Sequence, residues 1–186
     1  MFKSRVAGRI PAALATLALV AGLGITGTAP ASAACGTTWG SLPKASNSIT
    51  NAPITNVRTG RHDCFDRMVI DFRGKAPSYS IKYVSTVYGI GSGNQIPLRG
   101  NADLRLIMDA PAYDEWGRAT YHIANQNELS NVAGYLTFRQ LAWGGSHEAQ
   151  TLIGLGVRAR LPFRAFVLDG PGGGSRLIID VAHYWT

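Results

Sequence analysis

Short apolar runs separated by turn residues dominate the chain from residue 54 onward. Tyr79–Val84 alternates apolar and polar residues, which is typical of a strand with one face in water. Met68–Ile70 is a continuous apolar run with charges on both sides, and it predicts a strand deep in a sheet. No window keeps a helical apolar period over three turns. The pattern therefore predicts an all-β domain of about eight or nine short strands, as a β-sandwich or a closed barrel.

Glycine, proline and other turn residues set the limits of the predicted strands. The predicted strands cover residues 54–60, 65–73, 79–84, 104–108, 134–141, 151–157, 163–168 and 175–183. Residues 89–100 read as a long loop, Gly144-Gly145-Ser146 as a turn, and 170–174 as a flexible hairpin loop. Residues 112–131 have the least regular pattern and are compatible with a short helix.

One strand pattern occurs twice. Residues 67–72 and 176–181 both read arginine, three apolar residues, aspartate and one apolar residue. In each copy the arginine and the aspartate are four residues apart, so they share one face of a strand. We expect the aspartates to cap strand ends or to pair with arginine. The residues concerned are Arg67, Asp71, Arg176 and Asp180.

The first 33 residues have the pattern of a secretory signal peptide. Three basic residues precede the apolar stretch 12–25, and Ala31-Ser32-Ala33 forms a small-residue cleavage site. The stretch is short and contains glycines, which argues against a transmembrane segment. We therefore expect a secreted protein that is extracellular or associated with the cell wall. Residues 34–53 are rich in small polar residues, proline and glycine and predict an extended arm before a single domain at 54–186.

The charge of the chain gives little guidance about partners. The formal charge is +7, and three of the basic residues belong to the predicted signal peptide. The remaining charges are scattered without a run of lysine or arginine, so we expect no nucleic-acid partner. The small positive excess favours anionic wall polymers only weakly.

The two cysteines, Cys35 and Cys64, both follow the cleavage site. Two cysteines in an exported chain most simply form one disulfide, which would tie the arm to the first core strand. Lipidation of Cys35 is the alternative, although Ser32 stands where a lipobox usually has leucine. His62 is the only nearby histidine, and the chain contains no HxH or HExxH string, so we expect no metal and no cofactor.

The aromatic residues Tyr113, Trp116 and Trp143 are the candidate ligand-binding residues. They lie in or beside loops, and aromatic faces can stack on sugar rings. The alternative is that these side chains close the ends of the sandwich. We expect no catalytic residue. A small secreted carbohydrate-active hydrolase would be favoured if two loop carboxylates converged in a cleft with a raised pKa. The loop carboxylates are Asp109, Asp114, Glu115 and Glu128.

Two groups of residues resemble the AMIN-like domain of exported bacterial proteins. Gly60–Asp63, Phe65–Phe72 and Pro77–Tyr79 resemble its opening, and Pro162–Asp169 followed by Arg176–His183 resembles its end. The resemblance covers about 54–184. The AMIN-like domain is similar to the AMIN domain, which in envelope amidases and secretins is a β-sandwich used for targeting or peptidoglycan binding.

The resemblance implies a single-domain β-sandwich and a secreted, non-catalytic cell-envelope module. Its expected partner is peptidoglycan or another wall component. A protein-interaction module that pairs through a sheet edge is a further alternative. Two features depart from the family pattern. The glycine-rich loop 170–174 replaces a short turn, and Cys64 replaces a small residue.

Overall fold

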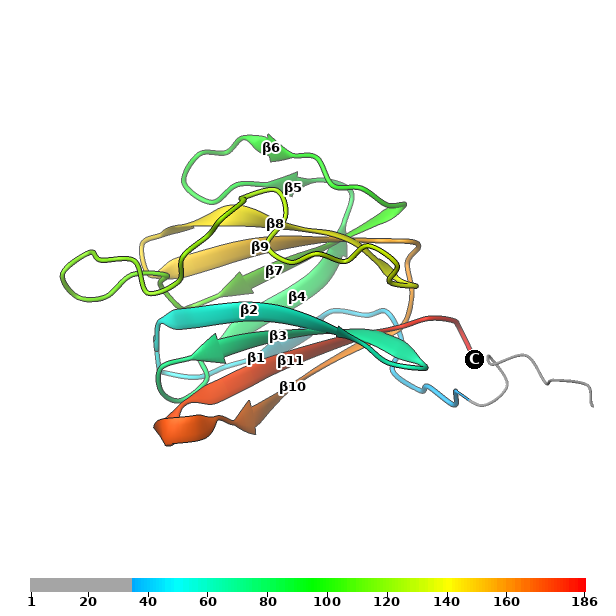
Figure 1. Ribbon diagram of the computed structural model, residues 1–186, viewed down its shortest axis with the longest axis horizontal. Coiled ribbons are helices and arrows are strands. Elements are labelled where there is room, and N and C mark those ends of the chain that lie inside the picture. Colours follow the sequence, from blue (N-terminus) through cyan, green and yellow to red (C-terminus); the bar gives the residue numbers. More distant parts are fainter. Residues whose placement is uncertain (1–34) are drawn as a thin grey trace, which may run out of the picture.

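The computed structural model describes residues 35–186, which form two antiparallel sheets packed face to face (Figure 1). The all-β sandwich expected from the sequence is confirmed. The predicted signal peptide, residues 1–33, lies outside the described residues. Within 35–186, no helix is long and apolar enough to cross a membrane.

The strands of each sheet are named here in the order in which they pair. The five-stranded sheet runs β1 (Lys44–Ser46), β4 (Tyr79–Val84), β7 (Ala102–Met108), β9 (Gln150–Val157) and β8 (Phe138–His147). The four-stranded sheet runs β10 (Phe163–Asp169), β11 (Ser175–Ala182), β3 (Phe65–Phe72) and β2 (Ile54–Arg61). A two-stranded hairpin joins β5 (Val87–Tyr88) to β6 (Gln95–Ile96), and a short 3₁₀ turn, η2 (Pro171–Gly173), precedes β11.

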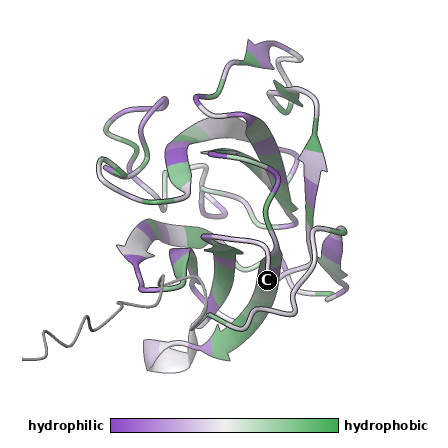
Figure 2. Cartoon of the chain, turned by 90° about the vertical axis from the view of Figure 1, so that its right-hand side faces the viewer, coloured by the Kyte–Doolittle hydropathy of each residue, from purple (hydrophilic) through white to green (hydrophobic). Residues whose placement is uncertain are grey.

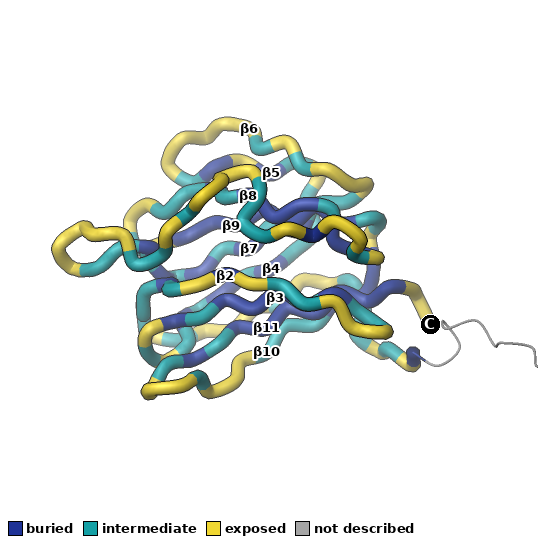
Figure 3. The backbone as a smooth tube through the Cα atoms, in the orientation of Figure 1, coloured by how far each residue is buried: buried dark blue, intermediate teal, exposed yellow. Residues whose placement is uncertain are grey.

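The core lies between the two sheets. Ile70 and Ile179 from the four-stranded sheet, and Leu104, Phe138 and Leu155 from the other, are fully buried in one apolar cluster. Burying each such side chain contributes about 1.5–3 kcal/mol. Apolar residues follow the strands and hydrophilic residues gather in the connections (Figure 2), and the burial pattern is the same (Figure 3).

The centre of the five-stranded sheet is covered on its outer face as well. The hairpin β5–β6 and the segment that follows it lie over β9, where Val87 is fully buried. A Cβ on Gly156 would collide with the carbonyl of Arg99, and one on Gly154 would press against Leu98. Glycine at these positions therefore allows the close approach. The long loop expected at 89–100 thus contains a strand, β6.

The turn expected at Gly144-Gly145-Ser146 is wrong, because these residues lie inside β8. The pairing of β8 with β9 shifts between Trp143 and Ser146, which marks a β-bulge. A Cβ on Gly144 would overlap Leu152, so the glycine serves close packing. The chain turns instead at Glu148 and Ala149, whose φ angles are 48° and 60°.

Residues 112–131 contain no helix. They form turns and one isolated bridge between Tyr113 and Ala119. Several of their polar groups bond to the neighbouring strands. Leu129 N–H, for example, donates to the carbonyl of Leu141 on β8. This segment therefore covers an edge of each sheet.

The predicted disulfide between Cys35 and Cys64 is confirmed, with 5.5 Å between the two Cα atoms. The sulfur that a lipid would need is thus already bonded. Trp39 packs edge-on against Phe65, with 5.7 Å between the ring centroids. The segment predicted as an extended arm then supplies β1, which pairs with β4 and completes that sheet.

Candidate functional site

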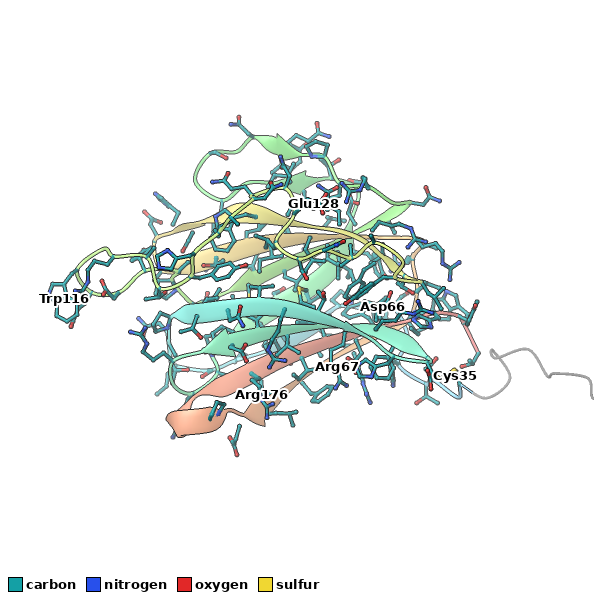
Figure 4. All side chains as sticks on the ribbon, viewed as in Figure 1. Cys35, Asp66, Arg67, Trp116, Glu128 and Arg176 are labelled. Atoms are coloured by element: carbon teal, nitrogen blue, oxygen red, sulfur yellow. A yellow bond between two sulfur atoms is a disulfide. The ribbon has the colours of Figure 1, made fainter. Side chains whose placement is uncertain are left out.

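One end of the sandwich carries the loops that follow β3, β7, β8 and β10. Figure 1 shows these loops at the left, opposite the C-terminus. The side chain of Trp116 lies at the tip of the most extended loop (Figure 4). It is 69% exposed, the largest exposed fraction of any tryptophan in the described residues. Most of the indole surface is therefore open to a ligand.

Asp114 organises the loop that presents Trp116. Its Oδ1 accepts hydrogen bonds from the backbone N–H groups of Trp116 (3.0 Å) and Arg118 (2.9 Å), and its Oδ2 accepts from Arg118 Nε (2.8 Å). Gly117 N–H donates to the carbonyl of Asp114, and Gly117 takes the left-handed conformation that the turn needs (φ 75°). The guanidinium of Arg118 lies 4.4 Å from the centre of the Trp116 ring.

The same contacts fix the charge of Asp114. Desolvation alone would raise the pKa of Asp114, but the hydrogen bonds from Arg118 and Trp116 and the Arg118 charge together lower it. Asp114 is therefore ionised at neutral pH and holds the loop in one shape. It does not have the raised pKa that a general acid needs.

A mostly apolar groove lies beside this loop. We define the aromatic groove by Pro53, Arg73, Tyr113, Glu115 and Trp116, and its volume is about 400 Å³. The Tyr113 hydroxyl accepts a hydrogen bond from the backbone N–H of Ala149 (3.1 Å), which fixes the ring against the turn after β8. The groove thus combines two aromatic side chains with one cation, Arg73, and two carboxylates, Asp114 and Glu115.

The structure brings two of the three predicted ligand residues together. Tyr113 and Trp116 line the aromatic groove, whereas Trp143 on β8 does not. Trp143 is half-buried against the core, with its ring centroid 5.9 Å from that of Tyr121. Trp143 therefore helps to close the sandwich.

Of the four loop carboxylates, only Asp114 and Glu115 line the same groove, and the pKa of Asp114 is lowered and not raised. Asp109 accepts a hydrogen bond from Gln150 Nε2 (2.9 Å), and Glu128 forms an ion pair with Arg99. Asp109, Glu128 and the Asp114–Glu115 pair line three different grooves. Within residues 35–186, no group of three His, Cys, Asp or Glu side chains could hold a metal ion.

Comparison with known families adds one finding. A family model of the AMIN-like domain matches residues 52–183, which include both sheets from β2 onward and the loop of Trp116. The chain belongs to the AMIN-like domain family. The AMIN-like domain is a non-catalytic domain of cell-envelope proteins, so this chain carries a cell-envelope module. No curated protein matches the chain.

The AMIN-like domain also encloses a polar pair, Asp66 and His183, that the sequence reasoning did not connect. Both side chains are completely buried, and His183 Nε2 lies 3.1 Å from Asp66 Oδ1. The other ring nitrogen of His183 lies 3.1 Å from the carbonyl of Asp63. Because water and ligands do not reach the pair, its role is structural. The sequence does indicate that Asp66 is buried, because strand alternation puts it on the same face as Met68 and Ile70.

The repeated strand pattern has a structural role as well. Asp180 pairs with Arg67, as expected, but Asp71 pairs with Arg58 on β2 and not with Arg176. Arg176 lies opposite Asp71 in the strand register, yet its guanidinium donates to the backbone carbonyl of Asp169. This carbonyl belongs to the last residue of β10, directly before the hairpin loop.

Proposed function

We propose that this AMIN-like domain is a secreted, non-catalytic module that binds peptidoglycan through the aromatic groove. The observation that carries the proposal is the exposed Trp116 ring on a loop fixed by Asp114. An aromatic face that is already ordered can stack on a sugar ring with little loss of conformational entropy. Arg73 and Glu115 border the same groove and can hydrogen-bond sugar hydroxyls and amides.

Two features support secretion. Residues 1–33 have the sequence pattern of a signal peptide, and the Cys35–Cys64 disulfide suits an oxidising compartment. The cell-envelope character of the family agrees with that location.

Co-sedimentation with insoluble peptidoglycan tests the proposal. The protein lacking residues 1–33 would be mixed with purified sacculi at low and moderate salt, and the bound fraction measured. We expect retention that survives moderate salt and falls several-fold in Trp116→Ala. Retention that disappears with salt would reflect only general attraction between a basic protein and an anionic polymer, and would count against the proposal.

Trp185→Ala is the matched control. Trp185 is also an exposed tryptophan, but it lies at the opposite end of the sandwich, where its Nε1 donates to the carbonyl of Arg160 (3.0 Å). The control should bind sacculi as the parent protein does. Equal losses in both variants would remove the aromatic groove from the proposal. Release of soluble muropeptides by the parent protein would instead favour the alternative function, a small secreted carbohydrate-active hydrolase.

One observation favours a second candidate function, pairing through a sheet edge. Among residues 35–186, the only backbone hydrogen bond from β10 to a segment outside its own hairpin joins Phe163 N–H to the carbonyl of Gly40. Val167 and Leu168 on β10 are 41% and 42% exposed. An open edge with apolar side chains can accept another strand. Concentration-dependent association in sedimentation velocity, lost in Val167→Lys, would support this candidate.

A further inference from the structure

A second groove lies at the same end of the sandwich, between the strands β2 and β3 and the loop 170–174. Its volume is about 650 Å³. We define the arginine groove by Arg58, Asp71, Arg73, Arg176 and the loop 170–174. Figure 4 shows Arg176 beside the hairpin loop, on the side of the four-stranded sheet that faces away from the core. Three guanidinium groups and one carboxylate line this groove, which leaves a formal charge of +2.

The single carboxylate of the groove is already engaged. Asp71 accepts hydrogen bonds from Arg58 Nε (3.0 Å) and Nη2 (3.1 Å). Arg176 directs Nε and Nη2 to the carbonyl of Asp169, at 3.1 and 2.6 Å, and has no carboxylate partner in the described part of the chain. Arg73 forms no ion pair with any of the described residues. Two cations of this groove therefore lack a counter-charge.

Another row on the same face of this sheet shows the contrast. There Asp180 lies between Arg67 and Arg164 and accepts hydrogen bonds from both, at 2.6–2.8 Å. Arg176, Asp71 and Arg58 repeat this order of charges across three strands, although Arg58 lies opposite Val69 and reaches Asp71 diagonally. Arg176 lines the arginine groove, and its guanidinium donates to the Asp169 carbonyl and not to Asp71. The second row thus keeps guanidinium N–H groups for an external acceptor.

The loop that borders the groove consists of four glycines and Pro171, so it presents mostly backbone to the groove. Gly172 and Gly173 have φ angles of 62° and 76°, and nothing lies within 4 Å of the place a Cβ would take. On the open side, Arg73 lines both the arginine groove and the aromatic groove. The two grooves therefore share Arg73 as part of their walls and lie next to each other.

We propose that the arginine groove binds the carboxylate of a peptide attached to the sugar in the aromatic groove. Guanidinium groups bind carboxylates through paired N–H donors. Asn56, which lines the groove and is exposed, offers the amide donor and acceptor that a peptide bond matches. The ligand class is thus an acidic glycopeptide. The inference rests on the proposed function, because it places the sugar in the aromatic groove.

The test uses muramyl dipeptide and the analogue in which the free γ-carboxylate of its isoglutamine residue is converted to an amide, which removes the negative charge. Binding to the protein would be followed in ¹H–¹⁵N NMR spectra that include the arginine Nε–H signals. We expect Arg176→Gln to weaken binding of the acid about tenfold and to leave binding of the amide unchanged. Arg73→Gln should weaken binding of both ligands, because Arg73 also borders the aromatic groove. Asp71→Asn should strengthen binding of the acid, because it removes the only negative charge from the groove.

Arg61→Gln is the matched control, since it removes one positive charge from the far end of β2, where Arg61 Nη1 donates to the carbonyl of Gly134 (3.1 Å). An equal loss in the control would overturn the inference in favour of general electrostatics. Equal affinity for acid and amide would overturn it while the proposed function stands. Failure of both ligands to bind would count against the proposed function as well. Tighter binding of glycerol phosphate through the same arginines would assign the groove to phosphate polymers instead.

Discussion

Arg67 on β3 and Asp180 on β11 face each other across the strand pair, and Arg67 donates from Nε (2.6 Å) and Nη2 (2.8 Å) to the two carboxylate oxygens. The contact follows from the repeated pattern, because two copies that run antiparallel set the arginine of one against the aspartate of the other. The hydrogen bond to Asp180 raises the pKa of Arg67 against the opposing effect of desolvation. Arg164 on β10 completes the contact.

We expect Asp180→Asn to lower the free energy of unfolding by about 2–3 kcal/mol, because a fully buried carboxylate is shared by two arginines. The partial exposure of both arginines keeps the loss below that of a fully buried pair. Asp71→Asn is the control. Its partner Arg58 is 48% exposed, so the loss should stay under about 1 kcal/mol. Urea unfolding at neutral pH measures both. Equal losses would contradict this account.

We expect Asp66→Asn to lower the free energy of unfolding less than Asp66→Ala does. Its Oδ2 accepts hydrogen bonds from the backbone N–H groups of Thr137 (2.6 Å) and Phe138 (2.9 Å). An asparagine oxygen can accept both, while its amide donates to a neutral His183. Alanine leaves two buried donors without an acceptor, and we expect a loss of about 3–5 kcal/mol, against less than half of that for asparagine. Thermal and urea unfolding of the two variants decide the point, and a similar loss in both would contradict it.

From the raised pKa of Tyr83 we expect the free energy of unfolding to fall at alkaline pH. Burial raises the pKa of Tyr83 from 10.0 to about 12, while its hydroxyl donates to the carbonyl of Leu161 (2.8 Å). The folded state therefore holds this proton more tightly than the unfolded state does. The resulting stabilisation is complete below pH 10 and is lost as pH rises through about 12, by roughly 2 kcal/mol.

Tyr83→Phe should show a smaller fall in stability over the same pH range. Urea unfolding at a series of alkaline pH values compares it with the parent protein, and tyrosinate absorbance follows the ionisation directly. A variant whose pH dependence equals that of the parent would show that other groups are responsible. Tyr79 and Tyr121, whose pKa values burial also raises, are the first to consider.

The disulfide between Cys35 and Cys64 should contribute about 3–4 kcal/mol to the free energy of unfolding. It closes a loop with a sequence separation of 29 residues, and the main effect is on the unfolded chain. The double replacement of both cysteines by serine, measured by urea unfolding, checks the value. The native contacts of Trp39 and β1 should remain, because they depend on packing and strand pairing. Loss of both would mean that the disulfide holds the segment in place.

Periodicity predicted most of the strands because alternation and short apolar runs are local properties. It failed at Gly144, because a glycine pair reads the same in a turn and in a bulge. Only the position of Leu152 on the next strand decides between them. The hairpin β5–β6 was hidden for the same reason, since its place over β9 depends on residues far away in the chain.

The candidate site was only partly predictable. Tyr113 and Trp116 are close in sequence, so one loop presents both. Trp143 lies in β8 on the same face as the core residue Leu141, two positions earlier, whereas the turn expected at Gly144 had put it beside a loop. Arg73 carried no signal in the sequence. It joins the site because the loop after β3 lies beside the loop after β7 at the same end of the sandwich.

The two ends of the described chain are tied together far from both grooves. Thr186 Oγ1 donates to the carbonyl of Thr37 (2.7 Å), and Cys35 (Figure 4) and the C-terminus (Figure 1) both lie at the side opposite Trp116. A molecule immobilised through its C-terminus on a bead or sensor chip would therefore present every groove loop to the solution in one orientation. Surface-based binding measurements can exploit this geometry without a spacer.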